Sequence, residues 1–226
     1  MKRNVTLAEI SDGRLYGEND MVKVDCRDCK GCSDCCRGMG DSIVLDPFDI
    51  CMLSEGLQKN FSQLLGEKKI ELGVVDGIIL PHMKMKDEET AEGKCGFLNE
   101  EGRCSIHPYR PGICRLFPLG RYYENGDFQY FLQTRECSQK DRSKVKAAKW
   151  IDVRNVRENH KFVNGWHSLL LSCEKLIAEN SAEESLAQNV SMYLLQAFYG
   201  MPYSGTEAFF EEFWHRMKKA KEDLGV

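Results

Sequence analysis

The side chains best suited to chemistry in this chain are its cysteines, which are numerous and unevenly distributed. Eleven occur among 226 residues, and all but Cys173 lie before residue 138. Five fall within one short stretch: Cys26, Cys29, Cys32, Cys35 and Cys36. Thiolates separated by two residues reach a common centre from a single turn of chain, as they do in zinc and iron–sulfur sites. Because this stretch has no apolar periodicity with which to pack, it predicts metal ligation.

A second group of thiols follows further along the chain: Cys95, Cys104, Cys114 and Cys137. Cys95 and Cys104 flank a predicted hairpin with a four-residue connection at 99–102, which would bring them to the same end. Pro108 and Pro111 stiffen the link to Cys114. Neither group has a core of its own, so we expect the two groups to lie close together. The alternative is one separate centre in each segment.

The identity of the metal is less constrained than its ligands. Cys26, Cys29, Cys32 and Cys36 fit the C-x2-C-x2-C-x3-C run of bacterial ferredoxins, but Arg37 stands where proline is expected. Thiolates suit zinc as well as iron. Eight or nine thiols in two sets, together with the ferredoxin-like run, favour an iron–sulfur cluster of the [4Fe–4S] type, with zinc as the alternative.

Residues near these cysteines are candidates for supporting roles. His107 follows Cys104 by three residues and is a possible ligand, although a surface or supporting histidine is the more ordinary role. Arg110 and Arg115 flank Cys114, and a guanidinium beside a thiolate cluster offsets negative charge and donates hydrogen bonds. Ordinary ion pairs with Asp or Glu are the alternative for both arginines. Cys51 and Cys173 lie on apolar faces of predicted helices, so we expect both to pack in a core.

These motifs together resemble the YkgJ-like cysteine-cluster family, which is a zinc- or iron-chelating CxxCxxCC domain. Its naming motif is matched by Cys29, Cys32, Cys35 and Cys36. Its other hallmark is matched by residues 95–98, 102–106, 110–111 and 114–118, and Cys137 suits the last family cysteine. Cys26 is additional, and His107 stands where tyrosine is usual. The resemblance covers residues 26–137 and implies a bound metal or iron–sulfur cluster. Members are often labelled iron–sulfur oxidoreductases, and a related domain occurs in flagellin lysine methylases.

Composition and the absence of other motifs exclude several classes of protein. The net charge of -4 gives no reason to expect nucleic-acid binding. The basic run from Lys140 to Arg157 is interrupted by acidic residues, as on a solvated helix face. No apolar run approaches the roughly 18 residues of a membrane span, and no apolar segment follows the basic start, so we expect a cytoplasmic protein. No G-x-G-x-x-G or phosphate-binding loop supports a nucleotide fold.

Local signals predict strands and turns before residue 138 and helices after it. Three dipeptides favour hairpin turns: Asp12-Gly13, Asp76-Gly77 and Asn125-Gly126. A helix is expected from Asp46-Pro47 to Gly56, and a short one over Ser62–Gly66. The remaining helices are expected from a basic run at 140–157, an apolar stripe from Phe162 to Ile177, and capping boxes at 181–184 and 204–207.

The sequence therefore predicts an α+β protein in which a small, irregular, metal-organised domain precedes a helical C-terminal region. The expected divisions are a strand-like segment at 1–25, a cysteine-cluster domain at 26–140 and helices at 141–226. The expected function is that of an iron–sulfur protein in electron transfer, or a redox partner in a modification reaction. One alternative is a zinc protein with structural sites and a helical tail that binds a protein partner. A further alternative, that the protein is an enzyme that modifies protein side chains, rests on family analogy alone.

Overall fold

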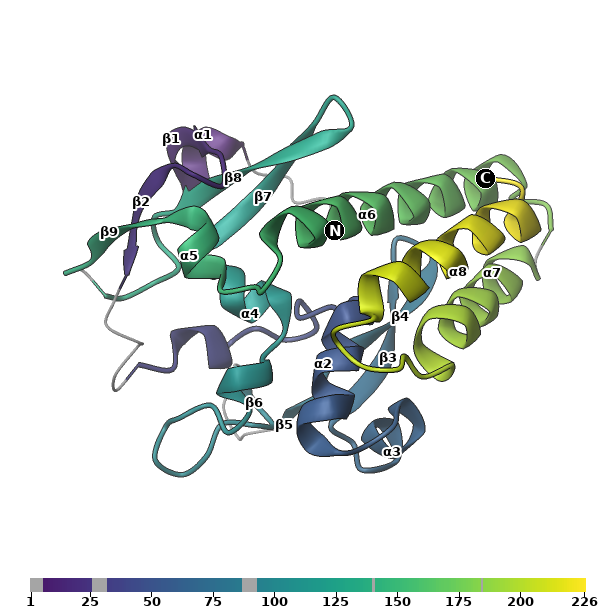
Figure 1. The fold of residues 1–226 in the computed structure, drawn as a ribbon, viewed down its shortest axis with the longest axis horizontal. Coiled ribbons are helices and arrows are strands. Elements are labelled where there is room, and N and C mark those ends of the chain that lie inside the picture. The colour runs from purple at the N-terminus through teal and green to yellow at the C-terminus, as the bar shows by residue number, and fades with distance from the viewer. Residues whose placement is uncertain (1–5, 26–31, 87–92, 140, 184) are drawn as a thin grey trace. The chain divides into compact units, whose positions relative to one another are not determined.

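The computed structural model describes residues 6–25, 32–86, 93–139, 141–183 and 185–226. The fold is α+β, as predicted, with small antiparallel sheets and a helical C-terminal region (Figure 1). Its contacts divide the chain into two compact units. Unit 1 comprises Met1–Gly40, Met85–Ser105 and Gly112–His160, and unit 2 comprises Asp41–Lys84, Ile106–Pro111 and Lys161–Val226. The domain boundaries expected from the sequence stay a prediction.

A three-stranded antiparallel sheet organises unit 1, in the order β1 (Ser11–Tyr16), β8 (Asp127–Gln133) and β7 (Leu119–Glu124). The predicted hairpin at Asn125-Gly126 is confirmed, since both residues have positive φ and join β7 to β8. The predicted hairpin at Asp12-Gly13 is wrong. Residues Leu7–Ile10 form the short helix α1, and β1 pairs with β8 through an irregularity between Ser11 and Leu15. The Asp-Gly pair therefore occupies a bulge rather than a turn.

Shorter elements complete unit 1. Strand β2 (Met21–Asp25) pairs with β9 (Ser143–Lys146), and β5 (Met85–Lys86) pairs with β6 (Lys94–Cys95). The helical pieces are η1 (Asp34–Cys36), α4 (Gly112–Leu116) and α5 (Ala147–Ile151). The single basic helix predicted over 140–157 is wrong. Lys144 and Lys146 alternate with the less exposed Val145, which is a strand pattern, and the chain leaves α5 at Asp152 with φ 53°.

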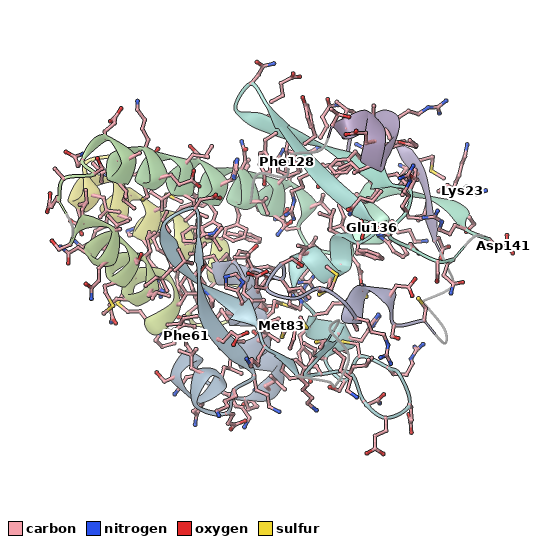
Figure 2. All side chains as sticks on the ribbon, turned by 180° about the vertical axis from the view of Figure 1, so that it is seen from behind. Lys23, Phe61, Met83, Phe128, Glu136 and Asp141 are labelled. Carbon is pink, nitrogen blue, oxygen red and sulfur yellow. The ribbon has the colours of Figure 1, made fainter. Side chains whose placement is uncertain are left out.

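The helix α2 (Pro47–Leu57) opens unit 2 where the sequence predicted it. Asp46 accepts the backbone N–H of Asp49 at 2.9 Å, and Pro47 occupies the first turn. The short helix α3 (Phe61–Gly66) follows, and Phe61, labelled in Figure 2, lies on it. The hairpin of β3 (Ile70–Val75) and β4 (Ile78–Met83) turns at Asp76-Gly77, as predicted. A short η2 (His107–Tyr109) also belongs to this unit.

Long helices supply the core of unit 2. These are α6 (Val156–Glu179), α7 (Leu186–Leu195), which continues into a π-helical turn at Gln196–Gly200, and α8 (Phe209–Leu224), and Figure 1 shows them side by side. Phe162 on α6 makes ring contacts with Phe209 and Phe213 on α8. The stripe predicted to begin at Phe162 is therefore the buried face of α6.

The helix starts predicted from the capping boxes are wrong. The helices α7 and α8 begin at Leu186 and Phe209, and neither has a side-chain cap. The backbone N–H of Ser204 is instead accepted by Glu212, and that of Thr206 by Glu55 at 2.9 Å. The residues of the second predicted box therefore belong to a loop held by carboxylates from other elements. Among the described helices, none has both the length and the apolarity needed to cross a membrane.

Candidate metal centre

The candidate ligand cysteines that the structure describes all belong to unit 1: Cys32, Cys35, Cys36, Cys95, Cys104, Cys114 and Cys137. None of these seven forms a disulfide within the described part of the chain. The other two candidates, Cys26 and Cys29, lie outside the described residues. The set of thiols predicted from the sequence is therefore gathered in one compact unit, apart from the two whose placement is not described.

A tight turn positions the first pair of thiols. The backbone N–H of Cys36 donates to the carbonyl of Ser33 at 2.8 Å, which closes η1. This turn places the sulfur atoms of Cys35 and Cys36 3.9 Å apart. Two sulfurs bound 2.3 Å from one tetrahedral zinc ion lie roughly 3.8 Å from each other. The two thiols are thus spaced as ligands of a single ion would be.

A turn at 99–102 positions the second pair. The N–H of Asn99 donates to Arg103, that of Ser105 donates to Phe97, and Gly102 supplies a positive φ of 71°. The predicted hairpin is reduced to an isolated bridge between Leu98 and Cys104, but its turn is confirmed. Cys95 is fixed separately, because β6 pairs with β5.

Backbone pairing brings the two cysteine segments together. Arg37 forms an isolated antiparallel bridge with Lys94, and the N–H of Gly38 donates to Gly93 at 3.2 Å. The residues that follow Cys36 therefore run beside the residues that precede Cys95. This contact explains how two segments without cores of their own are held next to each other.

Four thiols meet where these segments join, and we call Cys35, Cys36, Cys95 and Cys104 the central thiol cluster. Cys36 shares hydrogen bonds with Cys104 and with Cys35, and it interacts electrostatically with Cys95. Cys95 in turn interacts with Cys104 and Cys35. These contacts confirm the expectation that the two cysteine groups lie close together. Whether they share one metal ion stays a prediction.

The same contacts govern the protonation of these thiols. The hydrogen bonds with Cys104 and Cys35, followed by burial, raise the pKa of Cys36 well above its ordinary value. Burial raises the pKa of Cys95. A thiolate is the form that binds metal, so metal binding at these thiols must release protons.

The donor chemistry of the central thiol cluster fits zinc or iron, because both take thiolate ligands in protein sites. Within the described residues, however, no three Cys, His, Asp or Glu side chains already surround a single point. The fit is therefore one of chemistry and proximity.

A separate set of contacts surrounds Cys32. Its sulfur receives hydrogen bonds from the backbone of Asp34 and from the side chain of Gln139, and its thiol interacts with the Asp34 carboxylate. Burial is the largest influence on Cys32 and raises its pKa. The Asp34 carboxylate accepts the backbone N–H of Ser138 at 2.7 Å. Burial alone would raise the pKa of Asp34, but its hydrogen bonds with Ser138 and Cys32 outweigh burial and lower it. We call these contacts the Asp34 link.

The remaining candidates are placed as follows. Cys114 is half-buried on α4, and its neighbour Arg115 is buried at 4% exposure. His107 and Arg110 belong to unit 2, where Arg110 Nη1 donates to the His107 carbonyl at 2.8 Å. The roles predicted for His107, Arg110 and Arg115 beside a metal stay predictions.

Two cysteines are packing residues, as the sequence predicted. Cys51 and Cys173 lie in unit 2 with 6% and 0% exposure. Burial raises the pKa of Cys51 to about 12 and that of Cys173 to about 11. Asp34 was not predicted from the sequence. The only available signal was a carboxylate between Cys32 and Cys35, which by itself fits an exposed loop.

Comparison with known proteins finds one family model that matches the cysteine-rich part of the chain. Residues 28–138 match the model of the family CxxCxxCC, which is described as "Putative zinc- or iron-chelating domain". The matched segment contains all four thiols of the central thiol cluster, together with Cys32, Asp34 and Ser138, and it leaves Cys26 and Gln139 outside. No curated protein and no solved structure matches the chain.

Proposed function

Because residues 28–138 belong to the CxxCxxCC family of zinc- or iron-chelating domains, we propose that the central thiol cluster is a chelating centre of this protein. The observation that carries the proposal is the contact between Cys36 and Cys104, two cysteines far apart in the sequence. Burying thiolates costs free energy because they lose their hydration, and a bound cation offsets this cost by compensating their negative charge.

A single tetrahedral ion suits the geometry best. The 3.9 Å separation of the Cys35 and Cys36 sulfurs is close to that of two ligands on one zinc ion. In this role the metal is structural, since it joins two segments that are far apart in the sequence. The four thiols would hold the ion, and its binding energy would stabilise the folded state of unit 1.

An iron–sulfur protein is the second candidate. It is favoured by the number of thiols and by the ferredoxin-like spacing of Cys26, Cys29, Cys32 and Cys36. A [4Fe–4S] cluster would supply one-electron transfer, and its role would be that of an electron carrier or redox partner in a modification reaction. The thiolates of such a cluster bind different iron atoms, which requires a wider separation than that of Cys35 and Cys36.

We also propose a cytoplasmic location and a protein partner for the helices of unit 2. A reducing compartment suits a protein that uses many cysteines as thiols, and the helices follow the metal-binding segment in the chain. Co-purification of the full chain with its cellular partners, compared with a variant carrying charged substitutions at exposed positions of α8, tests the second point. Equal recovery of every partner by both would contradict it.

Metal analysis of the protein purified without oxygen tests the main proposal. We expect stoichiometric zinc or iron in the wild-type protein and a marked loss in Cys36→Ser and Cys104→Ser. Cys173→Ser is the matched control and should keep the full content. Acid-labile sulfide with visible absorbance would select the iron–sulfur candidate, and a colourless zinc protein would select the single ion. Full metal content in both Cys36→Ser and Cys104→Ser would disprove the proposal.

A further inference from the structure

The outer edge of strand β3 carries backbone groups that nothing in the described part of the chain pairs. Strands β3 and β4 form the two-stranded hairpin drawn in blue in Figure 1, and Val75 and Ile78 flank its two-residue turn. Residues that flank such a turn are hydrogen-bonded to each other, and the bonding alternates along both strands. The backbone groups of Val75 and of every second residue before it therefore face β4. Those of Ile70, Leu72 and Val74 face away from it.

The outer edge of β4, by contrast, is bonded. The backbone N–H of Ile79 donates to the Ser191 hydroxyl at 3.0 Å. The N–H of Leu45 donates to the carbonyl of Pro81 at 2.8 Å. Among the residues that the structure describes, no hydrogen bond of this kind reaches the outward groups of β3. The hairpin is therefore open on its β3 side.

The side chains along this open edge are apolar and exposed. Leu72 and Val74 are 45% and 70% exposed. They lie on the same face of the hairpin, because alternate residues of a strand point to the same side. A strand edge with unpaired backbone groups and exposed apolar side chains is a template for pairing with a strand of another chain.

The sequence of β3 is complementary to itself in the antiparallel direction. When Leu72 of one copy lies opposite Leu72 of another, Ile70 lies opposite Val74 at both ends. Every outward N–H and C=O group of both strands then meets a partner. A shift of two residues in either direction leaves one outward residue of each strand with no strand residue opposite it. The pairing centred on Leu72 is therefore the one that satisfies the whole edge.

Charge also favours a second copy as the occupant of this edge. Lys68 and Lys69 precede β3 and Asp76 follows it. Antiparallel pairing brings the positive start of each strand to the negative end of the other. Glu71 lies within the strand and is paired with Lys84 at 2.6 Å, which offsets repulsion between the Glu71 side chains of the two copies.

We propose that the outer edge of β3 is the interface of a symmetric dimer, in which the β3 strands of two copies pair antiparallel about Leu72. The two hairpins then form one four-stranded sheet in the order β4, β3, β3, β4, with a two-fold axis between the two Leu72 residues. The inference goes beyond the proposed function and does not depend on it, since β3 belongs to unit 2 and the described thiol candidates belong to unit 1.

Sedimentation equilibrium of the reduced full chain tests the interface. We expect dimers whose fraction rises with protein concentration, both before and after chelation of metal. Leu72→Lys should raise the Kd of the dimer at least about 10-fold, because it places two ammonium groups opposite each other at the axis. Leu171→Lys on α6 is the matched control, because Leu171 is 42% exposed, and it should dimerise as the wild-type protein does.

A mixture of two variants tests the pairing register. Leu72→Lys and Leu72→Glu should each dimerise more weakly than the wild-type protein. An equal mixture of the two should recover dimers, because the opposite charges meet at the axis only when position 72 lies opposite position 72.

Hydrogen exchange of the wild-type protein, followed by NMR, supplies a readout that needs no substitution. The amides of Leu72 and Val74 should become protected as the protein concentration rises. The amide of Gly73 faces β4 and should be protected at every concentration. A monomer at all concentrations, equal weakening by Leu171→Lys, or no recovery in the mixture would each overturn the inference. Protection of Leu72 only after a different protein is added would also overturn it, since the edge would then take another partner.

Discussion

Cys36 and Cys173 are both buried cysteines, with 8% and 0% exposure, yet their surroundings differ. Cys36 is hydrogen-bonded to the thiols of Cys104 and Cys35. Cys173 lies on the face of α6 that carries Phe162, Trp166 and Leu169 into the core of unit 2. Hydrogen bonds with Cys104 and Cys35, followed by burial, raise the pKa of Cys36, whereas burial raises the pKa of Cys173; the thiols beside Cys36 could share a cation with it.

The substitution Cys173→Ser should separate packing from ligation. It places a hydroxyl in an apolar site, so we expect unfolding free energy to fall by about 1–3 kcal/mol, while the metal content stays complete. Urea unfolding followed by circular dichroism, with metal analysis of the same sample, measures both quantities. Loss of metal in this variant would show that the division between packing and ligand cysteines is wrong.

The raised pKa of Cys173 also predicts a dependence on alkaline pH. Its ordinary value is 9.0 and its folded value is about 11. A raised pKa contributes stability that is complete below pH 9 and is lost as pH rises toward 11, because the unfolded chain ionises first. The stability advantage of the wild-type protein over Cys173→Ala should therefore narrow between pH 9 and pH 11. Thermal unfolding at a series of pH values checks this, and a constant difference would contradict it.

Arg216 shows how one side chain secures the end of an element. Its guanidinium donates to the carbonyls of Ala197, Met201 and Pro202 at 3.1, 2.7 and 2.8 Å. It also lies over the ring of Tyr203, 3.8 Å from the centroid. The carbonyls at the end of the π-helical turn are thus satisfied by α8, which joins two helical segments of unit 2.

Removing this guanidinium should destabilise unit 2. For Arg216→Ala we expect the free energy of unfolding to fall by about 1–2 kcal/mol, because three carbonyls, of which that of Ala197 is partly buried, lose a charged donor. Arg216→Lys should keep only part of the stability that Arg216 contributes, since an ammonium group lacks the planar fork of donors that a guanidinium presents. Lys219→Ala on the same helix is the control, because its ion pair with Asp223 is exposed and contributes little to stability. Chemical denaturation measures all three, and equal effects of Arg216→Ala and Lys219→Ala would refute this role.

At the scale of the whole molecule, the described thiol candidates and the aromatic side chains of α6 and α8 lie in different units. The described thiol candidates lie in unit 1, and the described cysteines of unit 2 are Cys51 and Cys173. Unit 2 instead has a core rich in aromatic side chains from α6 and α8. Its segment Asp41–Lys84 falls between two cysteine segments in the sequence but packs with the C-terminal helices.

Strong chelation should consequently loosen unit 1 and leave unit 2 folded. Hydrogen exchange should rise at residues 93–105 and 112–139 but stay low in α2 and β4 as well as in α6–α8, because the described thiol candidates lie in unit 1 and binding energy at such ligands is folding energy. Restoration of the metal is the control and should restore protection. Rapid exchange throughout 41–84 after chelation would show that the metal stabilises that segment too, as the sequence-based boundary at 26–140 implies.

Features decided by neighbouring residues were predictable from the sequence. The cap at Asp46 and the turns at Asp76-Gly77 and Asn125-Gly126 depend on backbone geometry within a few residues, and all three are present. The cysteine spacing likewise indicated thiol chemistry, and the apolar stripe of α6 indicated a core. Asp12-Gly13 failed as a turn because β8, more than a hundred residues away, pairs with β1.

Which thiols meet was decided by tertiary structure. The contact of Cys36 with Cys104 follows from the pairing of Arg37 with Lys94 and from the turn before Cys104. Within the Asp34 link, the hydrogen bond from the backbone N–H of Ser138 to the Asp34 carboxylate joins residues that are 104 positions apart. Hydrogen bonds and thiol contacts over such separations depend on how the intervening chain folds, whereas spacing constrains only residues within a turn or two of each other. The sequence alone therefore determined the kind of ligand, and the tertiary structure decided the partners of each thiol.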